Sequence, residues 1–131
     1  MILLDTHVVA WAVAEPDRLS RKAASAIRRA RSNQGMGIAA ITVWELAYLF
    51  SRGRLQAPGT VEECVRRVLD GAGPTILPIT PEIAALATQF PEDFPHDPAD
   101  RLIAATARAE GMALVTRDER LRRSPLLKTV W

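Results

Sequence analysis

The sequence predicts an α/β domain in which a central parallel sheet carries helices on both faces. Short apolar segments that do not alternate with polar residues recur along the chain, as is typical of strands buried on both faces. Stretches with helical periodicity separate them, and strands joined through helices pair in parallel. At 131 residues, 48% of them hydrophobic, the chain can form one substantial core, so we expect one domain over residues 1–131.

The elements follow in order from apolar runs and helix-start signals. The predicted strands are residues 2–4, 37–39, 75–77 and 113–116, with a candidate edge strand over 127–130. The predicted helices cover residues 6–14, 21–31, 42–52, 61–71, 81–89 and 98–110. Their starts are marked by the N-cap Ser20, by capping-box spacings at Thr42 and Thr60, and by Thr80-Pro81 and Asp97-Pro98.

Composition excludes several classes of protein. No apolar run reaches the length of about eighteen residues that a membrane helix needs, and no leader-like segment follows Met1, so we expect a cytoplasmic protein that does not contact a membrane. A single cysteine, Cys64, cannot form an internal disulfide. With only two histidines beside it, a structural zinc site is not expected, and Cys64 should be a buried apolar residue or a subunit contact.

Two acids stand where predicted strands end. Asp5 follows the first strand and Asp118 lies just past the fourth. Ligands bind at the carboxyl ends of the strands in open parallel sheets. If the two strands are neighbours, about 4.8 Å apart, both carboxylates can reach one ion. An acid that merely caps the following helix is the alternative for each.

Two further acids occupy positions that capping explains incompletely. Asp97 is accounted for as an N-cap, but Asp100 shares a helical face with Ile103, Ala104 and Ala107, which should pack on the sheet. Glu45 could complete a capping box with Thr42. It also lies in a helix that is apolar nearly all round and therefore expected to be buried on several sides, where an isolated acid needs a partner.

A divalent cation would be such a partner. Two carboxylates about 5 Å apart repel by roughly 3 kcal/mol at an effective dielectric near 20, so four acids together are unfavourable without a cation. All candidate ligands are oxygens, which favours Mg²⁺, or Mn²⁺, over Zn²⁺. If five acids converge, ten remain elsewhere against seventeen Lys and Arg, and that excess of positive charge suits a polyanion. The alternative is that the Arg and Lys side chains only solvate the outer faces of helices.

Four segments resemble the motif blocks of PIN domains, particularly the VapC toxins, in the family's order. They are Leu3-Leu4-Asp5-Thr6-His7, Ile41-Thr42-Val43-Trp44-Glu45-Leu46, the segment from Asp97-Pro98-Ala99-Asp100 to Ala107, and Val115-Thr116-Arg117-Asp118. The resemblance spans nearly the whole chain, and the blocks are highly specific together. It implies a single PIN-like domain with sheet order 3-2-1-4-5, a homodimer and a neutralising antitoxin partner.

The resemblance also implies an Mg²⁺-dependent endoribonuclease that cuts structured RNA such as tRNA or rRNA. It matches Asp5, Glu45, Asp100 and Asp118 to the family's acidic quartet, as catalytic residues and metal ligands, with Asp97 as an accessory acid. Thr6 and Thr116 resemble hydroxyl positions that orient acids or water. His7 stands where relatives often have Asn, and its role stays open.

Several alternatives remain open at this point. Arg101, Arg117 and Arg120 lie near the expected rim and could hold phosphates, or could be solvated surface arginines. An RNA- or partner-binding module without catalysis and a metal-dependent DNA nuclease are the rival functions. A receiver-type phosphoacceptor fits poorly, because neither Lys22 nor Lys128 is well placed. The apolar residues Trp11, Trp44, Tyr48, Leu49 and Phe50 exceed the needs of a small core and predict a surface partly buried in a dimer or antitoxin contact, with a generous core as the alternative.

Overall fold

The computed structural model describes all 131 residues and contains one sheet of five parallel strands. The strands are β1 (Ile2–Leu4), β2 (Met36–Ala39), β3 (Thr75–Leu77), β4 (Ala113–Val115) and β5 (Thr129–Val130). They lie in the order β3-β2-β1-β4-β5, which confirms the order implied by the resemblance to PIN domains. Because Leu4 of β1 pairs with Val115 of β4, these two strands end side by side and bring the residues that follow them together.

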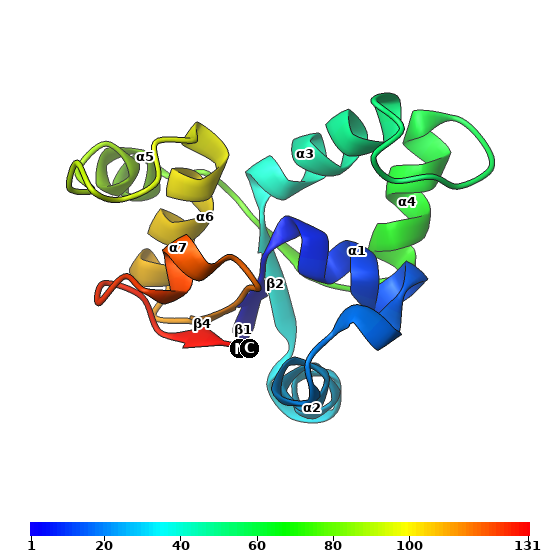
Figure 1. Cartoon of the computed structure of the whole chain (residues 1–131), viewed down its shortest axis with the longest axis horizontal. Helices are drawn as coiled ribbons and strands as arrows, with labels where there is room; N and C mark the ends of the chain where they lie inside the picture. Colours follow the sequence, from blue (N-terminus) through cyan, green and yellow to red (C-terminus); the bar gives the residue numbers. More distant parts are fainter.

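Helices cover both faces of this sheet (Figure 1). They are α1 (Thr6–Ala14), α2 (Arg21–Arg29), α3 (Ala40–Ser51), α4 (Val61–Ala72), α5 (Pro81–Ala87), α6 (Pro98–Ala109) and α7 (Glu119–Arg122). In Figure 1, α1, α2 and α4 lie on one side of the strands, and α5, α6 and α7 on the other. None of the helices is long and apolar enough to cross a membrane.

Neighbouring residues of the central strands belong to two different cores. Leu4 packs among Val8, Ile27 and other residues of α1 to α4, whereas Leu3 packs with Ile103 of α6. Alternate side chains of a strand point to opposite faces, so a run that is apolar throughout satisfies both cores. Leu3 and Leu4 are both fully buried, and burying such a side chain stabilises the fold by about 1.5–3 kcal/mol.

Most predicted element boundaries agree with the structure within a few residues. Thr60 and Glu63 form the predicted capping box of α4, and Asp97 caps α6 as expected. Cys64 is buried, as predicted. The short helix α7 was not predicted, and α2 continues as a π-helical turn over Ala30–Gln34.

The capping box predicted at Thr42 is wrong. Helix α3 begins at Ala40, directly after β2, and the last strand residue, Ala39, is its N-cap with no side-chain hydrogen bond. Thr42 is therefore inside the first turn of the helix and fully buried. The Thr42 hydroxyl and the carboxylate of Glu45 both contact the hydroxyl of Thr6 in α1, so tertiary contacts determine the positions of both side chains.

Candidate active site

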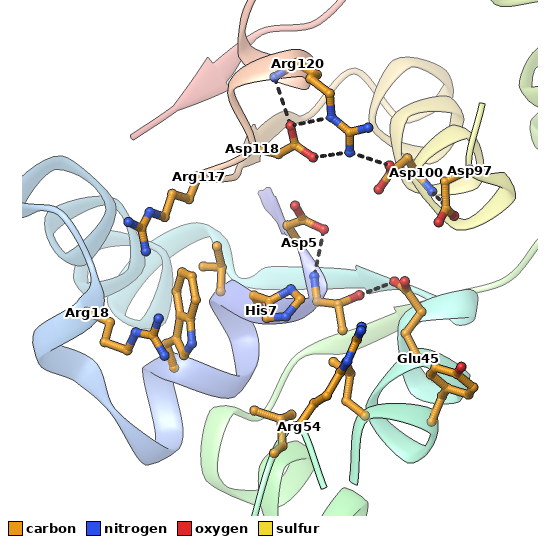
Figure 2. Close-up of a pocket in the computed structure, with 16 residues that line it drawn as sticks. Asp5, His7, Arg18, Glu45, Arg54, Asp97, Asp100, Arg117, Asp118 and Arg120 are labelled. Carbon is orange, nitrogen blue, oxygen red and sulfur yellow. Dashed lines mark hydrogen bonds and ion pairs between the residues drawn. The ribbon is translucent and has the colours of Figure 1, made fainter. Parts of the chain in front are cut away.

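A cleft of about 760 Å³ opens where β1 and β4 end, and all five acids singled out above line it (Figure 2). They are Asp5, Glu45, Asp97, Asp100 and Asp118. The acids come from four separate stretches of the chain, so the fold brings them together as predicted. Four arginines, Arg18, Arg54, Arg117 and Arg120, share the cleft with them.

Asp5 is the most enclosed of these acids. Its backbone N–H donates to the Val115 carbonyl at 3.0 Å, which fixes it at the end of β1 beside β4. Its Oδ1 accepts the Thr6 N–H at 2.9 Å as the N-cap of α1, and its Oδ2 accepts the Thr116 hydroxyl at 2.6 Å. Burial raises the pKa of Asp5 above its usual value, although these hydrogen bonds oppose the shift. Burial therefore disfavours the charged form of Asp5, which a bound cation would stabilise.

Glu45 reaches the same cleft from α3. The Thr6 hydroxyl donates to its Oε1 at 2.5 Å, and the Thr42 and Thr6 hydroxyl oxygens are 3.1 Å apart. Since the Thr6 proton is used by Glu45, Thr42 is the donor to Thr6. Burial raises the pKa of Glu45, and the nearby charges of Asp5 and Asp97 add to the rise. A chain of hydroxyls thus orients Glu45.

The start of α6 supplies two more acids. Oδ1 of Asp97 accepts the N–H groups of Ala99 and Asp100, at 2.8 and 3.4 Å, so Asp97 has the capping role predicted for it. Asp100 shares its helix face with Ile103, Ala104 and Ala107, all of which are buried. Burial and then repulsion from Asp5, Asp97 and Asp118 raise the pKa of Asp100 to about 7. The helix thus holds Asp100 toward the other acids.

Asp118 has a different environment because Arg120 lies against it (Figure 2). Nη2 of Arg120 donates to Oδ2 of Asp118 at 2.9 Å and contacts Oδ2 of Asp100 at 3.4 Å. Burial of Asp118 opposes its ionisation, but the hydrogen bonds from Arg120 outweigh that effect and lower the pKa of Asp118. One guanidinium thus compensates part of the negative charge of the cleft.

The chemistry of the donor set fits a hard divalent cation. Every candidate ligand is a carboxylate oxygen, and burial, followed for Glu45 and Asp100 by repulsion between the acids, raises the pKa values of three of them, so a cation would stabilise their charged forms. No three His, Cys, Asp or Glu side chains form a ready metal-binding group in this conformation. Arg120 contacts both Asp118 and Asp100, so a cation bound by these two carboxylates would replace those contacts.

The structure separates the three arginines that were predicted to hold phosphates. Arg117 and Arg120 line the cleft, but Arg101 does not. Nε of Arg101 donates to the Pro95 carbonyl at 2.9 Å, so this guanidinium stabilises the loop before α6. The prediction that Arg101 lies at the rim of the cleft is therefore wrong.

Four of the lining residues were not predicted as members of the cleft: the sequence assigns no role to His7, favours a dimer or antitoxin contact for Trp11, and does not distinguish Arg18 or Arg54. His7 and Trp11 are four residues apart on α1 and therefore share a face with one another, a spacing that could have indicated a functional side chain on that face. Arg18 and Arg54 lie in connecting segments, and no local pattern distinguishes them from solvated arginines.

The predicted apolar surface is smaller than expected. Trp11 and Leu49 are each only 7% exposed, whereas Trp44 is 59% and Tyr48 40% exposed. Helix α3 is buried or half-buried on its other faces, as expected, and only the face that carries Trp44, Tyr48 and Ser51 is exposed to solvent.

Comparison with known proteins adds evidence from homology. The model of the PIN domain family matches residues 2–125. The chain belongs to the PIN-domain family. This PIN domain is 44% identical to Ribonuclease VapC22 of Mycobacterium tuberculosis (strain ATCC 25618 / H37Rv) over 132 residues, which cover 99% of this chain and 98% of that protein.

Solved structures share the fold of this PIN domain. VapBC2 from Rickettsia felis, bound to a DNA fragment from its promoter, contains a chain with a TM-score of 0.73 at 19% identity, covering 98% of this chain and 97% of the other. FitAcB from Neisseria gonorrhoeae contains one with a TM-score of 0.65 at 26% identity, covering 98% and 96%. The likeness at 19% identity shows the fold alone.

Proposed function

We propose that this PIN domain is a metal-dependent endoribonuclease of the VapC toxin type, which hydrolyses phosphodiester bonds in structured RNA such as tRNA or rRNA. The observation that carries the proposal is the convergence of Asp5, Glu45, Asp100 and Asp118 on one cleft at the ends of β1 and β4. Carboxylates that hold hard cations are suited to phosphodiester chemistry. The 44% identity to a protein named as a ribonuclease supports RNA as the substrate.

The acids would hold Mg²⁺, with Mn²⁺ as a substitute. We assign Asp5 and Asp100 as direct ligands, and Asp118 and Glu45 as ligands that act directly or through water. Asp97 is an accessory acid whose charge adds to that of Glu45 and Asp100. When bound, the cation supplies Lewis-acid stabilisation of the charge that develops on the phosphate.

The surrounding side chains position the reacting groups. Thr116 orients Asp5 and Thr6 orients Glu45, through the hydrogen bonds described above. In-line attack of water on the phosphodiester would leave 5′-phosphate and 3′-hydroxyl ends. Arg117 and Arg120 lie in the cleft and would contact phosphates of the substrate.

We further propose a homodimer that a cognate antitoxin neutralises. The chains of similar fold include members of VapBC and FitAcB assemblies, which supports a protein partner. Trp44 and Tyr48 form an exposed apolar surface on α3 that one of these contacts would cover. The proposed substrates are cytoplasmic, and we expect the protein to act there.

The test compares Asp5→Asn and Asp100→Asn with Asp70→Asn on purified protein. Asp70 is exposed on α4 and outside the cleft, so it controls for loss of one negative charge. We expect cleavage of total RNA with Mg²⁺ by the wild type and the Asp70 variant, and none by the other two or in EDTA. Full activity of either cleft variant would overturn the proposal, and cleavage of DNA but not RNA would reassign the substrate.

A further inference from the structure

The wall of the cleft across from Asp97 and Asp100 carries two arginines on one aromatic ring. The guanidinium carbon of Arg18 lies 4.5 Å from the centroid of the Trp11 ring, and that of Arg117 lies 5.8 Å from it. Arg18 comes from the turn after α1, and Arg117 follows β4. Figure 2 shows both guanidinium groups on the side of the cleft away from Asp97 and Asp100.

We infer that Trp11, Arg18 and Arg117 form a second anion-binding subsite, which takes an RNA phosphate flanking the one that is cut. This inference rests on the proposed ribonuclease function and extends it to how the substrate is held. Arg18 and Arg117 are the binding groups, and Trp11 is the residue that positions them.

The Trp11 ring is held firmly enough to position its neighbours. Trp11 is 7% exposed, and its ring packs against those of His7 and Trp131, with distances between ring centroids of 5.6 Å and 6.2 Å. A guanidinium over an indole face is attracted by the negative charge of that face. An arginine held in this way loses less side-chain freedom when it binds a ligand.

The charge of this pair is largely uncompensated. Arg117 precedes Asp118 in the chain, yet it makes no ion pair with that carboxylate or any other, and Figure 2 shows it directed away from Asp118. Arg18 has one carboxylate partner, Glu15 at 3.1 Å, and both side chains are at least half exposed, so the pair contributes little. Two guanidinium groups on one ring repel each other, and an anion that contacts both would relieve that repulsion.

The buried ring also indicates which part of RNA binds. Stacking of a nucleobase needs an open aromatic face, and Trp11 exposes too little of its surface to offer one. The exposed groups are guanidiniums, whose planar forks match phosphate oxygens. The subsite therefore recognises the backbone and carries no base preference of its own.

The experiment measures binding of a fluorescently labelled oligouridine in EDTA, where no metal-dependent cleavage occurs. The variants are Arg18→Gln and Arg117→Gln, and Arg122→Gln is the control. Arg122 is exposed on α7, has no ion pair and lies outside the cleft. Arg122→Gln therefore removes one positive charge, as the cleft variants do, without changing the cleft. We expect each cleft variant to bind about fivefold more weakly, with the slope of log K against log salt reduced by about 0.7. Arg122→Gln should bind like the wild type.

Cleavage assays separate this inference from the proposed function. With Mg²⁺ present, the two cleft variants should show a raised KM for RNA and a nearly unchanged kcat, because the acids are intact. If the wild type cleaves RNA while both variants bind and cleave like Arg122→Gln, the subsite is overturned and the nuclease proposal stands. If no form cleaves RNA but the cleft variants still bind RNA more weakly and show a reduced slope of log K against log salt, the nuclease proposal fails and the subsite stands.

Discussion

The Thr116 hydroxyl donates to Oδ2 of Asp5 at 2.6 Å and so joins two acid-bearing segments that are 111 residues apart in the chain. The same hydroxyl oxygen accepts the backbone N–H of Asp118 at 3.1 Å. One fully buried side chain at the end of β4 therefore sets the position of two of the four acids.

Thr116→Val should uncouple these two acids. It removes the donor to Asp5 and the acceptor for Asp118, so we expect the free energy of unfolding to fall by about 1–3 kcal/mol. The pKa of Asp5 should rise further, because the Thr116 hydrogen bond lowers it at present. Mg²⁺ binding at neutral pH should weaken as a result. Urea unfolding and calorimetric titration with Mg²⁺ measure the two effects.

Thr106→Val is the matched control for that substitution. Thr106 is also buried, and its hydroxyl donates to the Leu102 carbonyl within α6 at 2.7 Å, away from the cleft. It should retain the wild-type affinity for Mg²⁺ whatever its effect on stability. Equal Mg²⁺ affinities of the two variants would show that Thr116 does not position the acids.

Asp100 should make the stability of the metal-free protein depend on pH. Its pKa is raised from 3.8 to about 7, so between these values the folded state keeps a proton that the unfolded state loses. The free energy of unfolding should therefore fall as pH rises from about 4 to about 7, by up to about 4 kcal/mol at 1.36 kcal/mol per unit, and then level off. Urea unfolding in EDTA across this range tests the prediction.

Asp100→Asn should reduce that pH dependence and make the metal-free protein more stable at about pH 8 than the wild type. A dependence of the same sign should remain, because burial also raises the pKa values of Asp5 and Glu45. Asp70→Asn should keep the wild-type profile. A wild-type profile in Asp100→Asn would contradict the assigned shift.

Arg120→Gln should affect metal binding and stability in opposite directions. The guanidinium compensates Asp118 and Asp100, so without a metal its loss should lower the free energy of unfolding, by about 0.2–1 kcal/mol for a largely exposed arginine. Mg²⁺ should bind more tightly, because it no longer competes with the guanidinium of Arg120 for these carboxylates. Titration calorimetry and unfolding in EDTA measure the two effects, with Arg122→Gln as control. Weaker Mg²⁺ binding would mean that Arg120 supports the site.

The positions of the acids could be predicted because they follow from topology. Parallel strands end at one edge of the sheet, so Asp5 and Asp118 had to meet once β1 and β4 were neighbours. Asp100 was predictable from its helix face, which carries three small or apolar residues that pack inward.

The errors arose where local patterns compete with tertiary contacts. Thr42 and Glu45 have capping-box spacing, but both interact with Thr6 of α1, a contact that no local pattern reveals. Arg101 and Arg117 carry the same side chain, and the sequence does not distinguish them. Only the folded structure shows that the guanidinium of Arg101 donates to backbone carbonyls of the loop before α6. The place of Arg18 beside Trp11 depends on the path of the turn after α1, which the sequence does not specify.

The exposed aromatic face of α3 should be a subunit interface. The Trp44 and Tyr48 rings stack in contact with solvent, with their centroids 5.3 Å apart. Trp44 and Val61 border a hollow of about 650 Å³ between α3 and α4. Burying such a patch in a dimer removes apolar area from water, at about 25 cal/mol per Å². We therefore expect the wild type to sediment as a dimer at micromolar concentration and Trp44→Ser to shift toward monomer. Ile79→Ser, at an exposed apolar residue outside this face, should remain dimeric, and a monomeric wild type would contradict the prediction.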